Sequence, residues 1–316
     1  MITVDLITSA FNEEDCISEL FERISNVMAT ESNYTYRILI IDNGSQDSTW
    51  EIIKAESERN SNIVGIRMSR NFSLDSAFTC GIDYANADIA IVMASDLQDP
   101  PEAIPLLLRK FEEGYDQVLV KINKRASVPL LRRILSKLFY RLARSMTSGM
   151  LPESVSDFRL INRRTYSAIR QLRESHRFLR GLGAWVGFNT TFIEIDRPPR
   201  FAGRSKWLGM SIFKVVGLAS KSILAYSAQP LAWVSVLGLS LSLLSIFGLT
   251  LLAIFWLVFG VPFAGFGSLI GVVVLGFSLT MLCIGILAQY VGLIYEEVKR
   301  RPLYLITETS KPLQIH

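Results

Sequence analysis

The segment IAIVMASDLQDPPE, residues 89–102, places two aspartates after an apolar run and follows them with two prolines. Asp96 comes directly after a stretch with the composition of a buried strand, and a buried carboxylate needs a partner. A divalent cation is a suitable partner, because proteins typically hold Mg²⁺ with one or two carboxylates plus substrate phosphates. Asp99, which precedes Pro100, fits the N-cap of a helix as well. The segment therefore predicts a metal site, with helix capping as the alternative role of Asp99.

The composition restricts the ligands that such a site can use. His176 and His316 are the only histidines, which excludes a histidine triad and a multi-histidine metal site. Cys16, Cys80 and Cys283 are scattered, odd in number and without metal-ligand spacing, which indicates a reduced cytosolic domain. Any metal must therefore be held by oxygen.

Alternating strand and helix patterns in the first 120 residues predict how these carboxylates are positioned. Apolar, β-rich runs alternate with helical patterns, which predicts an α/β domain with a mostly parallel sheet covered on both faces. The strand-like runs are residues 2–11, 36–42, 63–69 and 89–95. In such sheets ligands bind beyond the carboxyl ends of the strands. Four polar residues lie just past those ends, namely Asn12, Asp42, Arg70 and Asp96.

Eight motifs in order along the chain resemble a known family. They are AFNEED, IIDNGSQDST, MSRNF, ASDLQDPPE, VSDFRLINRR, RFLRGLGAWVGF, RFAGRSKW and QYVGLIYEEVKRRPLYL. Together they resemble the polyisoprenyl-phosphate glycosyltransferases of glycosyltransferase family 2, similar to dolichol-phosphate mannose synthases and bactoprenol glucosyltransferases. The resemblance covers essentially the whole chain. It implies a GT-A (Rossmann-like) domain that transfers one sugar from a nucleotide-sugar, a UDP-sugar, to undecaprenyl phosphate or a similar polyprenyl phosphate. The transfer would proceed with inversion at the anomeric carbon.

The resemblance also implies roles for particular residues. The metal, Mg²⁺ or Mn²⁺, would be bound by Asp96 and Gln98, and the catalytic residues would be Asp157 and Asp96. The nucleotide would be bound by Ser9, Phe11, Asn12, Glu13, Asp42 and Asn71. The acceptor phosphate would be held by Arg200, Lys206 and Arg133.

The chain departs from the family pattern at several of these motifs. Ala94 stands where the first carboxylate of the usual D-x-D motif is expected, and Asn43 and Leu74 replace a usual Asp and Lys. Two alternative functions follow: a non-catalytic membrane scaffold with a decayed sugar site, and a processive polysaccharide synthase. The second lacks support, because RFAGRSKW does not match the Q-x-x-R-W motif of such synthases.

The role of Asp157 is open to two interpretations. A carboxylate at this position is usually regarded as a base, but a phosphate monoester has a second pKa of about 6 and is already ionised near neutral pH. We therefore expect Asp157 to orient the acceptor, itself or through an arginine such as Arg159. The alternative is that Asp157 only pairs with Arg159 or Arg163 within the fold.

An uncharged stretch from Ser222 to Tyr295 predicts that the chain crosses a membrane. It contains two long apolar runs, and each is longer than the about 20 residues that a bilayer requires. We expect a two-helix transmembrane hairpin after the catalytic domain. The expected parts are a catalytic domain at 1–208, an interfacial amphipathic helix at 209–228, two transmembrane helices at 229–297 and a tail at 298–316.

Charge is divided unevenly and predicts the orientation in the membrane. Residues 1–120 carry 21 acidic and 8 basic side chains, and residues 121–316 carry 8 acidic and 25 basic ones. Basic residues flank the uncharged stretch on both sides, so the catalytic domain and both termini are expected in the cytoplasm of a bacterial inner membrane protein. Anionic lipid, rather than nucleic acid, is the expected partner of these bases. The basic amphipathic pattern at 128–146 fits an interfacial helix or one packed on the sheet.

The tail RPLYLITETSKPL has the composition of a short strand. An exposed lone strand tends to pair with another chain, so we expect the tail to pair with the catalytic domain or with a neighbouring subunit. The second possibility makes a homo-oligomer possible.

Overall fold

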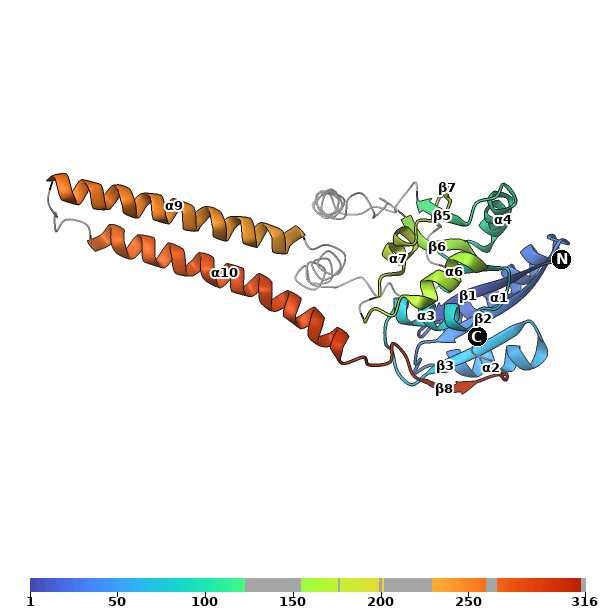
Figure 1. The fold of residues 1–316 in the computed structure, drawn as a ribbon. Helices are drawn as coiled ribbons and strands as arrows, with labels where there is room; N and C mark the ends of the chain where they lie inside the picture. Colours follow the sequence, from blue (N-terminus) through green and yellow to red (C-terminus); the bar gives the residue numbers. More distant parts are fainter. Residues whose placement is uncertain (123–154, 176, 199–200, 202–228, 260–265, 314–316) are drawn as a thin grey trace. The chain divides into compact units, whose positions relative to one another are not determined.

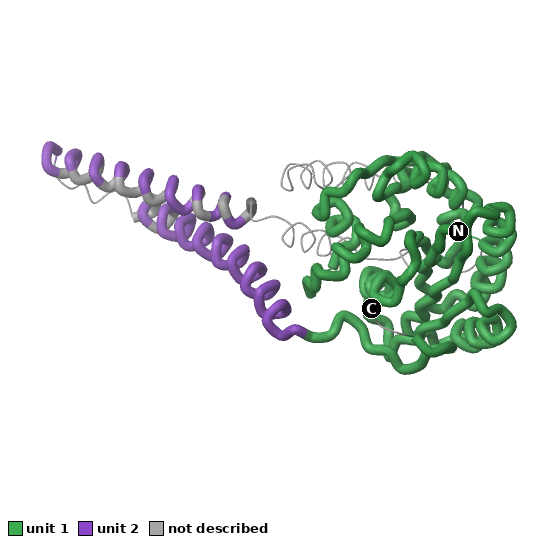
Figure 2. The backbone as a smooth tube through the Cα atoms, turned by 45° about the vertical axis from the view of Figure 1, so that its right-hand side comes forward, with its two compact units in different colours: residues 1–216, 301–316 green, residues 217–300 purple. Residues whose placement is uncertain are grey.

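The computed structural model divides the chain into two compact units. The first consists of residues 1–216 and 301–316, and the second of residues 217–300 (Figure 2). The residues that the structure describes are 1–122, 155–175, 177–198, 201, 229–259 and 266–313. The helices expected at 128–146 and 209–228 lie outside the described residues.

An eight-stranded sheet organises the first unit, in the order β7-β5-β6-β4-β1-β2-β3-β8 (Figure 1). The strands are β1 (Ile2–Ala10), β2 (Tyr34–Asp42), β3 (Ile63–Met68), β4 (Ile89–Ala94), β5 (Gln117–Ile122), β6 (Val155–Asn162), β7 (Thr190–Ile195) and β8 (Ile306–Thr309). The four apolar runs form β1 to β4, which pair in parallel. β6 and β8 run antiparallel to their neighbours, so the sheet is mixed. The predicted α/β class is confirmed.

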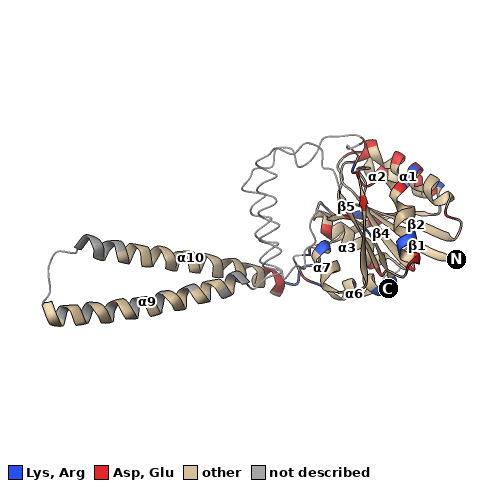
Figure 3. Cartoon of the chain, turned by 90° about the horizontal axis from the view of Figure 1, so that it is seen from above, with Lys and Arg blue, Asp and Glu red and all other residues tan. Residues whose placement is uncertain are grey.

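Helices cover both faces of the sheet (Figure 3). α1 (Glu14–Ala29), α2 (Thr49–Arg59) and α4 (Ile104–Glu112), which follows the 3₁₀ helix η1 (Pro101–Ala103), pack on one face. α3 (Leu74–Tyr84), α6 (Arg163–Gln171) and α7 (Leu179–Trp185) pack on the other. Strand side chains alternate between the faces, so Leu6 joins the first core while Ile7 contacts α3. There a side chain at Gly81 would lie 2.2 Å from Ile7, which explains the glycine.

The direction of β6 determines which of its residues reach the carboxyl ends of the parallel strands. β6 pairs antiparallel with β4, with Arg159 opposite Val92. The chain therefore enters β6 at the end where β4 finishes, and residues before Arg159 lie toward that end. Asp157 is thus placed at the same sheet edge as the loop that contains Asp96.

The second unit contains two long helices, α9 (Gln229–Phe259) and α10 (Phe266–Val298), which contact one another. The charged residues in these helices, Glu296 and Glu297, lie at the C-terminal end of α10 (Figure 3). Among the described residues, one stretch, Val272–Val298, is long and apolar enough to cross a membrane. Both segments that were expected to cross the membrane are therefore helical. Of the described stretches, the one within α10 meets the length and hydropathy criteria for a membrane span.

The C-terminal tail returns to the sheet. β8 pairs antiparallel with β3, and Leu305 accepts a backbone hydrogen bond from Ser69. This confirms the expectation that the tail pairs with the catalytic domain of its own chain. Pairing with a neighbouring subunit stays a prediction.

Candidate active site

The loop after β4 is closed by its own aspartates. Asp96 Oδ1 accepts a hydrogen bond from the Gln98 amide at 3.2 Å, and Leu97 between them has a left-handed φ of 59°. Asp99 Oδ2 accepts one from the Ala94 amide at 3.1 Å. The side chain of Asp99 is directed to the end of β4, and the helix that follows has no side-chain cap. The alternative prediction, that Asp99 caps the following helix, is therefore wrong.

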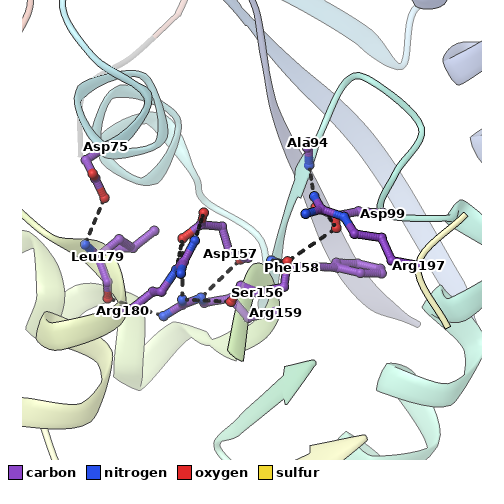
Figure 4. Close-up of polar contacts among 10 residues, drawn as sticks. All are labelled: Asp75, Ala94, Asp99, Ser156, Asp157, Phe158, Arg159, Leu179, Arg180 and Arg197. Atoms are coloured by element: carbon purple, nitrogen blue, oxygen red, sulfur yellow. Dashed lines mark hydrogen bonds and ion pairs between the residues drawn. The ribbon is translucent and has the colours of Figure 1, made fainter. Parts of the chain in front are cut away.

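Asp99 also connects this loop to two other elements (Figure 4). Its Oδ1 lies 3.3 Å from Ser156 Oγ on β6 and 3.3 Å from Arg197 Nη2 just after β7. The carboxyl is fully buried, and burial raises its pKa to about 6, although the charge of Arg197 and the Ala94 amide favour the ionised form. Asp99 therefore fixes the position of the loop relative to β6.

Asp157 forms a two-pronged ion pair with Arg180 on α7 (Figure 4). Arg180 Nε lies 2.7 Å from Oδ1 and Nη2 lies 2.6 Å from Oδ2. Burial disfavours the charge on Asp157, but the hydrogen bonds and charge of Arg180 outweigh it, and the pKa of Asp157 is below its ordinary value. Asp157 is therefore an ionised carboxylate with both oxygens engaged.

The two arginines expected to accompany Asp157 have other partners. Arg159 is buried and donates to the carbonyls of Ser156, Asp157 and Leu179, and its nearest approach to the Asp157 carboxylate is 3.9 Å. Arg163 lies 3.7 Å from Asp88. Sequence analysis missed Arg180, whose only signal was its place in the motif RFLRGLGAW.

Asp75, on α3, contacts the start of α7 next to the ion pair (Figure 4). Its Oδ1 accepts a hydrogen bond from the Leu179 amide at 2.9 Å, one residue before Arg180. Burial, followed by repulsion from Asp157, raises the pKa of Asp75 to about 6. Asp75 thus holds the start of the helix that presents Arg180.

The predicted nucleotide residues lie together at the ends of β1, β2 and β3. Asp42 is fully buried; its Oδ1 accepts from the Ser45 amide at 2.9 Å and its Oδ2 lies 3.4 Å from Arg67 Nε. Asn12 is interlocked with the same loop, because its amide donates to Ser45 Oγ and its Oδ1 accepts from the Gln46 amide. Asp42 therefore shapes the loop, and its carboxylate is fully buried.

The remaining predicted residues at this edge are held mainly through their backbones. The Ser9 carbonyl accepts a hydrogen bond from Ser95 Oγ at 2.7 Å, which joins β1 to the loop after β4. The Glu13 amide donates to Thr49 Oγ1. Phe11 is half-buried next to them, and Asn71 is exposed after β3. The six residues are thus brought together by neighbouring loops.

Asn43, one of the departures from the family pattern, has a structural explanation. Its Oδ1 accepts from the Phe72 amide and its Nδ2 donates to the Ser73 carbonyl, both at 3.0 Å. A carboxylate accepts but cannot donate, so only an amide makes both bonds. Asn43 therefore ties the loop after β2 to the loop after β3. The adjacent Gly44 has a φ of 75° and lies so close to Arg70 that a side chain would not fit.

Asp96 and Gln98 fit a divalent cation in part. Both offer oxygen, the donor that Mg²⁺ prefers, and no described residue donates a hydrogen bond to Asp96 Oδ2. In the described ranges, no group of three or more His, Cys, Asp or Glu side chains could hold a metal ion. With Ala94 in the position of a third ligand, further oxygens would have to come from the substrate. Arg133, Arg200 and Lys206, the predicted phosphate ligands, lie outside the described residues.

The mixed α/β sheet, with acidic side chains past its carboxyl edge, is the arrangement expected of a GT-A-like glycosyltransferase domain. Residues 5–170 match the family described as Glycosyl transferase family 2. The chain belongs to that family.

Curated relatives match over nearly their full length. The chain is 36% identical to an uncharacterized glycosyltransferase of Synechocystis sp., over 97% of this chain and 95% of the relative. It is 34% identical to the bactoprenol glucosyl transferase of Shigella phage SfII, over 98% of both chains. The resemblance to bactoprenol glucosyltransferases is confirmed.

A solved structure shares the fold. Glucosyl-3-phosphoglycerate synthase from Mycobacterium tuberculosis, in complex with Mn²⁺, UDP and phosphoglyceric acid, superposes with a TM-score of 0.51 at 15% identity. The match covers 71% of this chain and 76% of that one. At this identity the likeness shows the fold alone.

Proposed function

We propose that this protein is a membrane-bound hexosyltransferase that moves one glucose or similar sugar from a UDP-sugar to undecaprenyl phosphate, with inversion. The observation that carries the proposal is the similarity to bactoprenol glucosyl transferases along the full length of both chains. The ionised Asp157–Arg180 pair beside the Asp96 loop supports it, because the pair offers a positioned cation next to a potential metal ligand.

The proposed reaction joins an acceptor phosphate oxygen to the anomeric carbon of the sugar. The bond from that carbon to the nucleoside diphosphate breaks, and its electron pair leaves with the diphosphate. The acceptor is already an anion near neutral pH, so it requires orientation more than deprotonation. Asp157, with both oxygens bonded to Arg180, is a poor base and a good support for that guanidinium. Arg180, about 30% exposed, is then the side chain that attracts the acceptor or donor phosphate.

Asp96 and Gln98 would hold Mg²⁺ or Mn²⁺ against the donor diphosphate. A bound cation supplies Lewis-acid stabilisation of the charge that develops on the leaving oxygen. Arg133, Arg200 and Lys206 are proposed to hold the acceptor phosphate. Nucleotide binding is assigned to the loops that contain Asn12 and Asp42.

The apolar helices place the enzyme where its acceptor is dissolved. We propose that both α9 and α10 cross the inner membrane, with residues 1–208 and 298–316 in the cytoplasm and residues 209–228 at the interface. The bases on both sides of the uncharged stretch support this orientation.

A donor panel tests the proposal. Membranes that contain the protein are incubated with undecaprenyl phosphate and one radiolabelled nucleotide-sugar at a time, and the chloroform-soluble label is measured. We expect a lipid product that carries one sugar, from a UDP-hexose. If none of the donors gives a labelled product, the result favours the non-catalytic scaffold. A long water-soluble polymer would favour a processive synthase.

A further inference from the structure

The tail strand β8 contacts more than the edge of the sheet. Glu308 stands opposite Arg67 in the β3–β8 register. Its Oε2 accepts a hydrogen bond from Trp50 Nε1 at 3.0 Å, and its Oε1 from Lys54 Nζ at 2.9 Å. Thr307 Oγ1 donates to the Arg67 carbonyl at 3.3 Å. The tail therefore contacts both the Trp50 ring and the β3 backbone at Arg67.

Arg67 in turn reaches the loop at the end of β2. Its guanidinium lies 5.7 Å from the centroid of the Trp50 ring, and its Nε lies 3.4 Å from Asp42 Oδ2. Asp42 is fully buried, and within the described residues this oxygen has no hydrogen-bond donor. A buried carboxylate without a nearby positive charge destabilises the fold. The position of Arg67 therefore affects the stability of the loop that contains Asp42.

The loop then extends the connection to Asn12. Asp42 Oδ1 holds the Ser45 amide, and Ser45 Oγ holds the Asn12 amide at 2.9 Å. A continuous series of contacts thus runs from Glu308 through Trp50 and Arg67 to this loop. The same tail begins three residues after the end of α10.

Other contacts attach the tail independently of Glu308. Ser310 Oγ lies 2.7 Å from Ser57 Oγ and accepts from the Gly65 amide at 2.8 Å. Lys311 Nζ donates to the carbonyls of three residues before and within β3, and Tyr304 donates to Asp83 at 2.9 Å. We therefore expect β8 to stay in place when Glu308 is substituted, so the contribution of the Glu308 side chain to nucleotide binding can be measured separately.

We propose that Glu308 is a positioning residue for the nucleotide site: it fixes Trp50, and through it Arg67, against the buried Asp42. This inference rests on the proposed role of the Asn12–Asp42 loops in binding the donor nucleotide. The C-terminal strand is then a structural part of the donor site, although it lies more than 250 residues away in sequence.

The experiment measures the dissociation constant of UDP for the full chain in detergent by calorimetry. Glu308→Ala removes the hydrogen bonds from Trp50 and Lys54 and is expected to raise the dissociation constant about five- to tenfold, the size of effect of the one bond, to Trp50, that belongs to the series. Glu308→Gln, which keeps an acceptor for Trp50, is expected to restore most of the affinity. Lys311→Met, which removes a tail contact outside the series, is the matched control and should leave the dissociation constant unchanged.

A double-mutant cycle separates this role from general loosening of the tail. If Glu308 acts through Arg67, Glu308→Ala should have little further effect in an Arg67→Gln background. The inference is overturned by an unchanged dissociation constant in Glu308→Ala, by independent effects of the two substitutions, or by an equal effect of Lys311→Met. If the unsubstituted chain binds another nucleoside diphosphate and not UDP, the donor assignment is wrong and the comparison is made with that nucleotide. If the unsubstituted chain binds no nucleoside diphosphate, both the proposed donor site and the proposed role of Glu308 are rejected.

Discussion

Both carboxylate oxygens of Asp157 are bonded to the guanidinium of Arg180, at 2.7 and 2.6 Å (Figure 4). This geometry keeps the carboxylate ionised and engages one lone pair on each oxygen, which makes the carboxylate a weaker general base. It also fixes the direction of Arg180, a partly exposed arginine beside the Asp96 loop. The pair is therefore suited to hold an anion in place, which is what an already ionised acceptor requires.

Asp157→Asn is expected to lower kcat by about 100-fold or more at every pH between 6 and 9, because the two-pronged pair is lost whatever the protonation state. The measurement is the pH profile of turnover with a fixed donor and undecaprenyl phosphate. Recovery of turnover well above the second pKa of the acceptor would instead identify Asp157 as a base.

Removal of Arg180 should destabilise the domain through the charge that it leaves behind. Arg180→Met leaves Asp157 without its main partner, and we expect a loss of about 1–3 kcal/mol in unfolding free energy, below the range for fully buried pairs because Arg180 is partly exposed. Thermal unfolding in detergent checks this. The double variant with Asp157→Asn should recover part of the loss; strictly additive losses would mean that the two side chains do not interact.

Local sequence patterns were sufficient to predict the parallel half of the sheet. β1 to β4 are continuous apolar runs, and the polar residues that follow them had to meet at one edge once the strands were parallel. The tail strand could be predicted for the same reason, because a short β-rich segment tends to pair. Its choice of β3 as a partner depended on the tertiary fold.

The partners of Asp157 could not be read from the sequence. Asp157 has three arginines in its own or neighbouring motifs: Arg159, Arg163 and Arg180. Arg180 is its partner because β6 runs antiparallel to β4 and lies beside α7, which carries Arg180. In the same way, Asp99 has the sequence context of a helix cap, while its burial against Ser156 makes it a connection between strands. Such choices depend on packing between distant segments.

Asp96→Ala should abolish transfer, by at least about 100-fold, while the protein stays folded and membrane-bound. The reason is that it removes the one carboxylate proposed to bind the metal. Transfer assays with and without EDTA, together with thermal unfolding of the variant, check this. Near-normal turnover by the variant, or activity that EDTA does not change, would rule out the metal assignment.

Both termini are expected on the cytoplasmic side, because basic residues lie at each end of the uncharged stretch, Lys221 before it and Lys299–Arg301 after it. A phosphatase fused after His316 should be inactive, and a fluorescent protein at the same place should be bright. The opposite pattern would show that an odd number of helices crosses the membrane.

Asp75 predicts a pH dependence of stability. Burial, with repulsion from Asp157, raises its pKa from 3.8 to about 6, so between these values the folded protein holds a proton that the unfolded chain releases. The free energy of unfolding that depends on this group is therefore greatest below pH 3.8 and falls as the pH rises from 3.8 through about 6, with a full cost of about 3 kcal/mol above pH 7. Asp75→Asn does not titrate and can still accept the Leu179 hydrogen bond. The unfolding temperature of the variant minus that of the unsubstituted protein should therefore increase from pH 5 to pH 7 and then stay level. A difference that is constant with pH would mean that Asp75 titrates as an ordinary carboxyl.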